Sequence, residues 1–302
     1  MPLVWLNGKL IEDSEASVTL RDTGLLHGAG VFTTMRSYGG KVFRLDHHLA
    51  RLRRSCEALF IPLQHKDDEL TTAAAEILRG NNLLAARLRL TVTRGIAEND
   101  PLHGMKLNPT AFLTATDLQP YPVEYYERGM TAILLDDQKL NPYDIQAGHK
   151  TLNYLSRLSA LRAANQRGAG EALWFNVHNY LQSGSISNVF IVRGQTLITP
   201  PTPIDLQDKT LAETIPYPRS NTLPGVVRGA VIEIATEADI DFRIEAIDVN
   251  GLLQADEVFL TNSIMGVMPI CRLERKAVGA DKPGPITLKL AERYAVEVES
   301  GG

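Results

Sequence analysis

The spacing of apolar residues predicts two helices in the first third of the chain. Between Leu45 and Phe60, apolar side chains recur at alternating steps of four and three, so that a helix would bury one stripe. Asp46 lies at the start of this segment, where a carboxylate interacts favourably with the positive end of a helix dipole. A second helical pattern runs from Asp67 to Arg79. We therefore expect two helices that each pack one face against a core.

Alternation of apolar and polar residues predicts strands around these helices. The run ARLRLTVTRG places Leu88, Leu90 and Val92 on one side of a strand, and Arg87 and Arg89 on the other. Shorter strand-like runs are VWLNG, GKLIE, KVFRL and AFLTATDL, and glycine pairs separate some of them. Strands and helices thus share one N-terminal unit.

The pattern divides into two domains at a polar segment. Residues 119–126 contain two prolines and are typical of a linker, so we predict an N-terminal domain at 1–118 and a larger C-terminal domain at 127–302. The C-terminal part lacks a regular βαβ alternation, which favours an α+β fold over a doubly wound sheet. Its expected elements are the strand TAILLDD, a helix from about Leu152 to Gln166, a hairpin-rich block from Glu171 to Ile198, a helix that opens at Pro224-Gly225, the strand DEVFLTN and a last amphipathic helix.

Composition excludes several classes of protein. A length of 302 residues exceeds what one core usually serves, and a net charge of -4 without a basic run argues against nucleic acid as a partner. No segment approaches the roughly 18 apolar residues that span a bilayer, so we expect no membrane contact. Cys56 and Cys271 lie far apart and fit neither metal nor disulfide spacing, as expected for core cysteines in a reducing cytoplasm.

Lys150 has a setting that could suit covalent chemistry. It follows Gly148-His149 and precedes the helical pattern TLNYLSRLSALRAA. A cation at a helix N-terminus is disfavoured, so such a lysine would tend toward the neutral amine that Schiff-base chemistry requires. A surface lysine at a helix start would look the same, and position alone leaves both interpretations open.

Three other features could bind an anion. The Pro224-Gly225 turn opens an apolar helix whose first backbone N–H groups could contact a phosphate, and Asn262-Ser263 offers small polar donors at a strand end. Arg51 could add a charge-assisted contact. Each has an ordinary alternative as a turn, a helix start or a solvated arginine. Together with Lys150 they form the inventory for an aldehyde cofactor that carries a phosphate.

The sequence resembles one family along almost its whole length. The similar blocks occur in the family's order. They are NGKLIEDSEASVTLRDTGLLHGAGVFTTMR, FRLDHHLARLRRSCEAL, LRLTVTRG, HKTLNYLSRL, GEALWFNVHNYLQSGSISNVFIVRGQTLITP, TLPGVVRGAVIEIA and DEVFLTNSIMGVMPI. The family is the class IV (fold type IV) pyridoxal-phosphate group, which contains branched-chain aminotransferases, D-amino acid aminotransferases and aminodeoxychorismate lyases.

The resemblance implies a two-domain homodimer that holds pyridoxal 5'-phosphate between its domains and acts on a small molecule, and composition leads us to expect a cytoplasmic protein. Lys150 would form the Schiff base with the cofactor and later move protons. Arg51, the turn at Val226-Val227 and Ser263 would hold the phosphate. Tyr154 matches the tyrosine that bonds the cofactor's phenolic oxygen in many members.

Two positions depart from the family pattern. Members normally carry a glutamate five residues before the asparagine of the SNVF-like motif, and its carboxylate keeps the pyridine nitrogen protonated. That position is Ser183 here, which should weaken the ring as an electron acceptor and favour eliminations over transamination. A threonine usually stands where this chain has Val227, and losing its hydroxyl would cost about 1 kcal/mol of phosphate binding.

The blocks GVFTTMR and TNSIMGVMPI are most similar to aminodeoxychorismate lyases, which release pyruvate and form 4-aminobenzoate for folate biosynthesis. Branched-chain aminotransferases usually show a glutamate-glycine pair where this chain has Thr33-Thr34. The arginine-x-histidine motif of D-amino acid aminotransferases and the arginine-glycine pair of many lyases are both missing from IAENDPLHG. We therefore place the lyase first, an aminotransferase second, and a weakly active or non-catalytic member third. Candidate substrate contacts are Arg36, Arg87, Arg89, Asn262 and Ile264.

Overall fold

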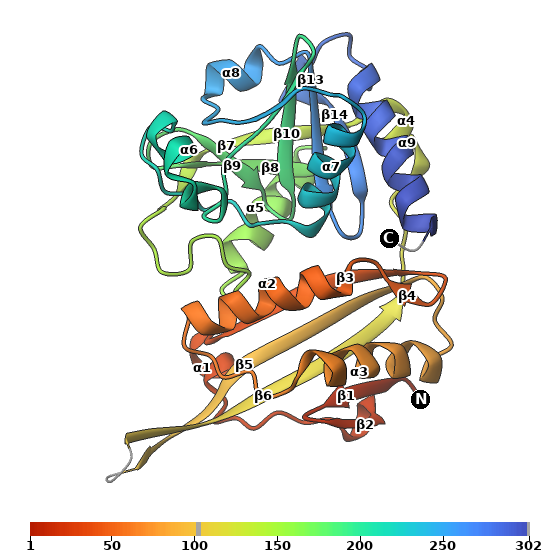
Figure 1. The fold of residues 1–302 in the computed structure, drawn as a ribbon, viewed down its shortest axis with the longest axis vertical. Coiled ribbons are helices and arrows are strands. Elements are labelled where there is room, and N and C mark those ends of the chain that lie inside the picture. The colour runs from red at the N-terminus through yellow and green to blue at the C-terminus, as the bar shows by residue number, and fades with distance from the viewer. Residues whose placement is uncertain (101–103, 301–302) are drawn as a thin grey trace. The chain divides into compact units, whose positions relative to one another are not determined.

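The computed structural model describes residues 1–100 and 104–300, and its chain forms two compact units (Figure 1). Each unit combines one sheet with helices, and the α+β fold class expected from the sequence is confirmed. No helix among the described residues is long and apolar enough to cross a membrane. The first unit contains Met1–Gln119, His149–Asn153 and the end of the last helix from Val298, and the second contains Pro120–Gly148 and Tyr154–Glu297.

Within the described residues, the first unit has a six-stranded sheet in the order β2-β1-β6-β5-β3-β4. Neighbouring strands pair antiparallel, and β5 and β6 form a long hairpin that extends past the other strands (Figure 1). The strands are β1 (Leu3–Leu6), β2 (Lys9–Glu12), β3 (Gly30–Tyr38), β4 (Lys41–Val42), β5 (Ala86–Asp100) and β6 (Gly104–Asp117). The helices are η1 (Asp13–Glu15), α1 (Thr23–His27), α2 (Leu45–Ala58) and α3 (Asp67–Gly80).

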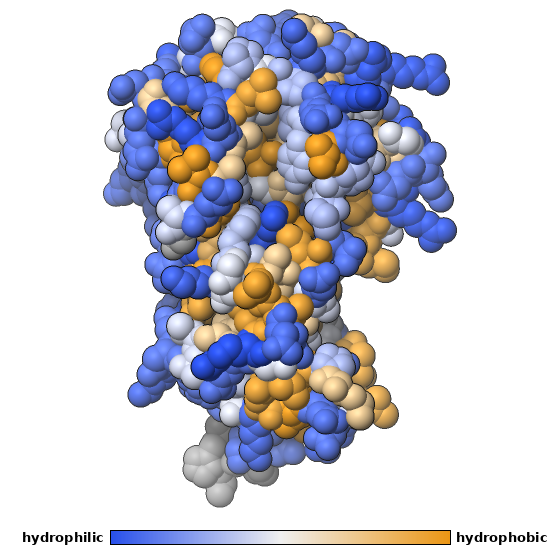
Figure 2. Space-filling model, turned by 90° about the vertical axis from the view of Figure 1, so that its right-hand side faces the viewer, coloured by the Kyte–Doolittle hydropathy of each residue, from blue (hydrophilic) through white to orange (hydrophobic). Residues whose placement is uncertain are grey.

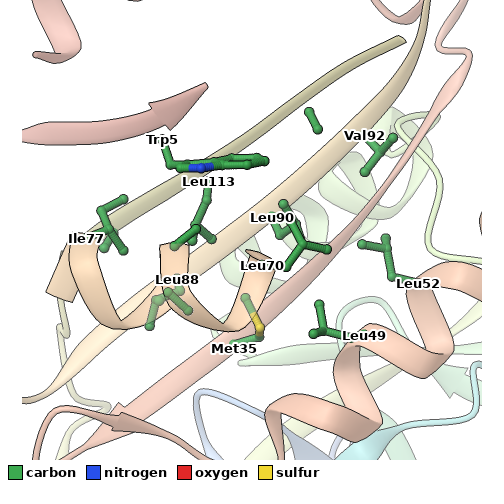
Figure 3. Packing of buried hydrophobic residues seen from close by; sticks show 14 of the residues in the cluster. Trp5, Met35, Leu49, Leu52, Leu70, Ile77, Leu88, Leu90, Val92 and Leu113 are labelled. Carbon is green, nitrogen blue, oxygen red and sulfur yellow. The ribbon is translucent and has the colours of Figure 1, made fainter. Parts of the chain in front are cut away.

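The core of the first unit lies between its sheet and the helices α2 and α3 (Figure 3). The expected stripes account for it: Leu49 and Leu52 of α2 and Ile77 of α3 are almost completely buried. Both helices begin at the expected residue and end within two residues of the expected position. The strand residues that meet them are Trp5, Met35, Leu88, Leu90, Val92 and Leu113.

Within the described residues, the second unit has a nine-stranded mixed sheet in the order β12-β11-β10-β13-β14-β7-β8-β9, with β15 beside β14. Its strands are β7 (Met130–Leu140), β8 (Glu171–Asn176), β9 (Leu181–Gly184), β10 (Asn188–Arg193), β11 (Thr196–Thr199), β12 (Phe242–Ile244), β13 (Glu257–Asn262), β14 (Gly266–Leu273) and β15 (Lys276–Ala277). Its helices are α4 (Val123–Arg128), α5 (Leu155–Gln166), η2 (Asp205–Gln207), α6 (Lys209–Thr214), α7 (Val226–Glu237), α8 (Val249–Leu253) and most of α9 (Pro285–Ser300).

Three parts of the chain depart from the expected domain division. The segment predicted as a linker at 119–126 contains the start of α4 and belongs to the second unit from Pro120. The end of α9 from Val298 and the segment around Lys150 both belong to the first unit.

Lys150 was assigned with the C-terminal domain, whereas His149–Asn153 belongs to the first unit. The reason is backbone pairing: Phe32 N donates to the Lys150 carbonyl at 2.9 Å, and Leu152 N donates to the Gly30 carbonyl at 2.9 Å. The segment is therefore an extended partner of β3.

The helix after Lys150 also begins later than predicted. It was expected from about Leu152, but α5 starts at Leu155, because Leu152 is held in the pairing with β3. The helix-dipole argument for Lys150 is therefore wrong, since the lysine lies five residues before the helix. The structural support for Lys150 as the candidate cofactor lysine is its position beside β3.

Candidate active site

The candidate residues fall into two groups, one in each unit. The first unit holds Lys150, Arg51 and the three candidate substrate arginines. The second unit holds Tyr154, Ser183, the start of α7 and the turn after β13. Each group is described separately below. Part of the IAENDPLHG segment, residues 101–103, lies outside the described residues.

The side chain of Lys150 lies against an aromatic ring of β3. Its Nζ is 4.7 Å from the centre of the Phe32 ring, and the guanidinium carbon of Arg89 is 3.6 Å from the same ring. Phe32 itself is almost fully buried. Cations are attracted to aromatic faces at this range, so Phe32 brings the candidate cofactor lysine and a candidate substrate arginine to one ring.

Arg51 belongs to a buried chain of hydrogen bonds between α2 and β3. Its guanidinium donates to Thr33 Oγ1 at 2.9 Å, and Thr33 Oγ1 lies 2.8 Å from His48 Nδ1. Arg51 also approaches His48 Nδ1 at 3.5 Å, and because a guanidinium can only donate, Nδ1 is the acceptor there. The Thr33 hydroxyl therefore accepts from Arg51 and donates to His48. His48 Nδ1 is then an acceptor, which requires a neutral ring. The chain orients Arg51 at the position expected to bind phosphate.

The protonation state of His48 makes this chain of hydrogen bonds sensitive to pH. Burial, followed by the charge of Arg51, holds the pKa of His48 well below its usual value of 6.5. The folded protein therefore resists protonation at a pH where the unfolded chain binds a proton. The stability that this contributes is present above pH 6.5 and is lost as the pH falls toward the folded-state pKa.

We expect the first unit to lose stability below about pH 6.5, with His48 contributing a slope of up to about 1.4 kcal/mol per pH unit. Urea unfolding can be followed through Trp5 in a Trp174→Phe background, since the chain has 2 tryptophans, one in each unit. The His48→Gln variant should show a shallower slope by about one proton. The exposed His27 provides the control, and equal slopes for His48→Gln and His27→Gln would contradict this account.

A further contact ties the lysine segment to α2. His149 Nδ1 and Ser55 Oγ are 2.9 Å apart, and burial lowers the pKa of His149. Ser55 is one helical turn from Arg51. The residues before and after Lys150 are thus fixed to α2 and β3 respectively, so the backbone at the lysine is held from both sides.

The three candidate substrate arginines share one face of the sheet. Arg36 lies opposite Arg87 in the β3–β5 register, and Thr34 lies opposite Arg89. The core side of these strands is the other face, which confirms the alternation read from the sequence. Arg87 is exposed and Arg89 is partly buried. Like charges directly opposite each other repel, so this face favours an anionic ligand.

In the second unit, α7 begins in a way that suits a phosphate. Gly225 is its N-cap and no side chain caps the first turn. A Cβ on Gly225 would lie 1.9 Å from Asn188 Oδ1, so only glycine allows this close approach. Free N–H groups at the start of a twelve-residue helix attract anions. Val226 and Val227 are buried and contribute backbone only.

The turn after β13 adds a hydroxyl group. Asn262 Oδ1 accepts hydrogen bonds from Ile264 N and Met265 N, both at 2.8 Å, so Asn262 shapes the turn itself. The partly exposed hydroxyl of Ser263 has no partner among the described residues. The hydroxyl of the buried Thr261 likewise lacks a partner within the described chain. Donors and backbone N–H groups of this kind fit the phosphate of pyridoxal phosphate.

Ser183 lies on β9 beside two charged residues that the sequence did not single out. Arg157 Nη1 donates to Ser183 Oγ at 3.3 Å and to the carbonyls of Gly184 at 3.0 Å and Ser185 at 3.2 Å. Tyr154 donates its hydroxyl to the same Ser185 carbonyl at 3.3 Å. Arg157 occupied a polar helix position that is usually solvated, so only the fold could place it at Ser183.

Glu171 is the second such residue, and its carboxylate is 1% exposed. It accepts hydrogen bonds from Ala172 N, Ser185 N, Ile186 N and the Ser187 hydroxyl. Burial raises its pKa, and these donors act against that rise. A charged residue at the start of the otherwise apolar strand EALWF was the signal in the sequence. Its carboxylate is fully engaged in holding the turn after β9.

A protein-family profile described as Amino-transferase class IV matches residues 30–273. The chain is 33% identical over 293 residues to a putative branched-chain-amino-acid aminotransferase of Methanocaldococcus jannaschii, covering 96% of this chain and 94% of the relative. It is 30% identical over 284 residues to the D-alanine aminotransferase of Bacillus licheniformis, covering 94% of this chain and 93% of the relative.

Solved structures are similar over nearly the whole chain. A branched-chain amino acid aminotransferase from T.th., solved with pyridoxamine 5'-phosphate, has a TM-score of 0.86 at 25% identity and covers 99% of this chain and 94% of its own. The 4-amino-4-deoxychorismate lyase of Pseudomonas aeruginosa has a TM-score of 0.79 at 26% identity and covers 98% of this chain and 100% of its own.

Proposed function

From the premise that the chain belongs to the class IV aminotransferase family, whose members are enzymes that use pyridoxal phosphate, we propose that it is a lyase for 4-amino-4-deoxychorismate. The products would be 4-aminobenzoate and pyruvate. The observation that carries this proposal is the pair formed by Ser183 and Arg157, at the position where the family normally has a carboxylate.

The Ser183–Arg157 pair affects whether elimination or transamination is favoured, because the two reactions differ in where the electrons of the broken C–H bond go. When bound, pyridoxal phosphate supplies an aldehyde that condenses with an amine and a ring that accepts electrons when a bond to the amine-bearing carbon breaks. Without a carboxylate, Ser183 gives that ring less support. A substrate with a leaving group on the neighbouring carbon depends less on the electron-accepting capacity of the ring, because the leaving group takes the electrons away. In the proposed reaction the C–H bond at the amine-bearing carbon and the C–O bond at the neighbouring carbon break, and the carbon ring of the substrate becomes aromatic. The enolpyruvate that leaves takes up a proton and is released as pyruvate.

The residues of each unit have separate parts in this proposal. Lys150 would hold the cofactor and take the proton from the amine-bearing carbon. In the first unit, Arg51 is the candidate phosphate contact. In the second unit, the start of α7 and Ser263 are candidate phosphate contacts, and Tyr154 would lie near the phenolic oxygen. In the first unit, the arginine face formed by Arg36, Arg87 and Arg89 would bind carboxylates of the substrate. In the second unit, the turn residues Asn262 and Ile264 are separate candidate substrate contacts.

The second candidate is an aminotransferase for branched-chain or D-amino acids. The relatives at 33% and 30% identity favour it, because both are named as aminotransferases. A transamination has no leaving group on the neighbouring carbon, so it would depend more strongly on a carboxylate partner for the ring nitrogen. Ser183 suits that requirement poorly, which is why we place this activity second.

A panel of substrates separates the candidates. The purified enzyme with pyridoxal phosphate is expected to form 4-aminobenzoate and pyruvate in equal amounts from 4-amino-4-deoxychorismate. Exchange of 2-oxoacids with L- or D-amino acids should be at least about tenfold slower in kcat/KM, a difference of about 1.4 kcal/mol. Efficient exchange without pyruvate would assign the aminotransferase. No turnover of any substrate would assign the weakly active member that we placed third.

We also propose a homodimer, on the basis of exposed apolar side chains in the first unit. Leu20, Leu25 and Leu26 are 80%, 62% and 57% exposed within a short stretch around α1. Isolated leucines on a surface are common, but clusters mark contact sites. Figure 2 shows that apolar patches interrupt a mostly hydrophilic surface on the face in view.

A further inference from the structure

Arg157 brings a positive charge to Ser183, and within the described chain its hydrogen bonds go to no carboxylate. It lies in the first turn of α5, and that helix packs through Ala160 and Ala164 against Trp174 and Ala172 of β8. The acceptors of its hydrogen bonds are the Ser183 hydroxyl and two backbone carbonyls. The guanidinium carbon is 5.6 Å from the centre of the Trp174 ring. Arg157 is thus fixed by neutral oxygens and one aromatic face.

The contact with Arg157 decides which way the Ser183 hydroxyl can act. A hydroxyl has one proton and two lone pairs, whereas a guanidinium can only donate. Ser183 must therefore accept from Arg157, and its single proton is directed toward another acceptor. Ser183 is 4% exposed, so water has little access to take that role.

The neighbouring carboxylate does not reverse this polarity. Glu171 attracts the charge of Arg157 at longer range, yet its oxygens are occupied by three backbone N–H groups and the Ser187 hydroxyl. Tyr154, the other titratable neighbour, directs its hydroxyl to the Ser185 carbonyl. The group that meets Ser183 therefore faces a hydrogen-bond donor backed by a cation.

We propose that Arg157 and Ser183 together hold the pyridine nitrogen of pyridoxal phosphate in its unprotonated form. The inference rests on the proposed placement of Ser183 at that nitrogen. Ser183 donates a hydrogen bond to the nitrogen, and Arg157 acts through Ser183 as a positioning residue. A proton on the nitrogen would have to use the second lone pair of a hydroxyl that already accepts from a cation, so the charge of Arg157 disfavours the protonated form. Family members normally have a carboxylate here, which keeps the ring nitrogen protonated. In this chain the Ser183 hydroxyl instead donates a hydrogen bond to the lone pair of the nitrogen.

The direct test is ¹⁵N NMR of the holoenzyme loaded with cofactor labelled at the ring nitrogen. We expect the resonance of an unprotonated pyridine nitrogen throughout about pH 6.5–8, where most proteins are stable. A resonance at the upfield position of a pyridinium nitrogen would overturn the proposal. The measurement needs no variant and no substrate, so it does not depend on which reaction the enzyme performs.

Variants identify the residues responsible. Ser183→Glu should move the resonance to the pyridinium position, and Arg157→Met should allow partial protonation within the same pH range. Arg157→Lys keeps the charge and should retain most of the wild-type signal. Arg162→Met changes an exposed arginine of the same helix and should leave the spectrum unchanged. A spectrum that is identical in wild type, Ser183→Glu and Arg157→Met would also overturn the proposal.

The failure of this inference can be told apart from failure of the proposed function. Borohydride treatment followed by peptide mass spectrometry shows whether the cofactor is bound at Lys150, independently of the ring nitrogen. Cofactor bound at Lys150 with a protonated nitrogen would overturn only the inference. An unprotonated nitrogen in an enzyme that yields no pyruvate would overturn only the lyase.

Discussion

Replacing Lys150 by alanine is expected to lower turnover by at least about 10³-fold, because both the covalent anchor of the cofactor and the proton-transferring amine are removed. The substitution should leave the surrounding fold unchanged, since backbone hydrogen bonds to β3 hold the segment at Lys150 and do not involve its side chain. Initial rates on the substrate that the panel identifies would measure the loss. Borohydride treatment should then fix cofactor to the wild-type protein alone.

The matched control for this prediction is Lys9→Ala, which removes an exposed lysine of β2 in the same unit. It should retain wild-type rates and borohydride labelling at residue 150. Wild-type rates in Lys150→Ala, together with borohydride labelling at a different lysine, would show that this other lysine carries the cofactor. In that case the alignment of HKTLNYL with the family's lysine block would be mistaken.

Arg51→Ala should weaken binding of pyridoxal phosphate by about 10- to 100-fold, which corresponds to about 1.5–3 kcal/mol for a hydrogen bond to a charged group. Arg51 is 7% exposed and is oriented by Thr33, so little conformational entropy is lost when it meets a phosphate. Titration of the apoprotein with cofactor, followed by absorbance, measures the affinity. Arg51→Lys should recover part of it, because lysine keeps the charge but not the planar fork.

Arg54 offers a control from the same helix. It is exposed and lies less than one turn from Arg51, so Arg54→Ala removes an equal charge without touching the buried chain. Equal losses of affinity in Arg51→Ala and Arg54→Ala would indicate a general electrostatic effect. Our account requires the loss to be confined to Arg51.

The longer helices α2, α3, α5, α7 and α9 could be predicted from the sequence, whereas the short helices α1, α4, α6 and α8 and the central strand β3 could not. The stripes of α2 and α3 have strong helical periodicity, and β5 alternates cleanly over Leu88, Leu90 and Val92. The strand β3 was hidden because GVFTTMR is glycine-rich at its start and its outer face is polar or aromatic. Periodicity finds a strand whose two faces differ in polarity, and the buried Thr33 and Phe32 blur that difference.

The start of α5 was misplaced for a related reason. The pattern TLNYLSRL is compatible with a helix from its first residue, and only pairing with β3 decides that Leu152 is extended. Such pairing joins residues about 120 positions apart, beyond what a local pattern can encode. Lys150 was identified by resemblance, whereas the local argument offered for it was wrong.

Arg157 and Glu171 show the same limit for the site. A buried arginine in a helix cannot be distinguished in sequence from a solvated one, since both occupy polar positions. The departure at Ser183 was visible in the sequence, but its partner was not. The structure adds the direction of the hydrogen bond, from Arg157 to Ser183, and with it the polarity of the site.

The pairing of His149–Asn153 with β3 also determines where the protein can be divided into fragments that keep the surroundings of Lys150 intact. The chain leaves the first unit at Gln119, returns for five residues and leaves again before Tyr154. A fragment ending at residue 118 would lose the edge partner of β3, and a fragment beginning there would carry the lysine without the strand that holds it. Domain shuffling and separate expression at this apparent boundary would both divide the lysine from its support.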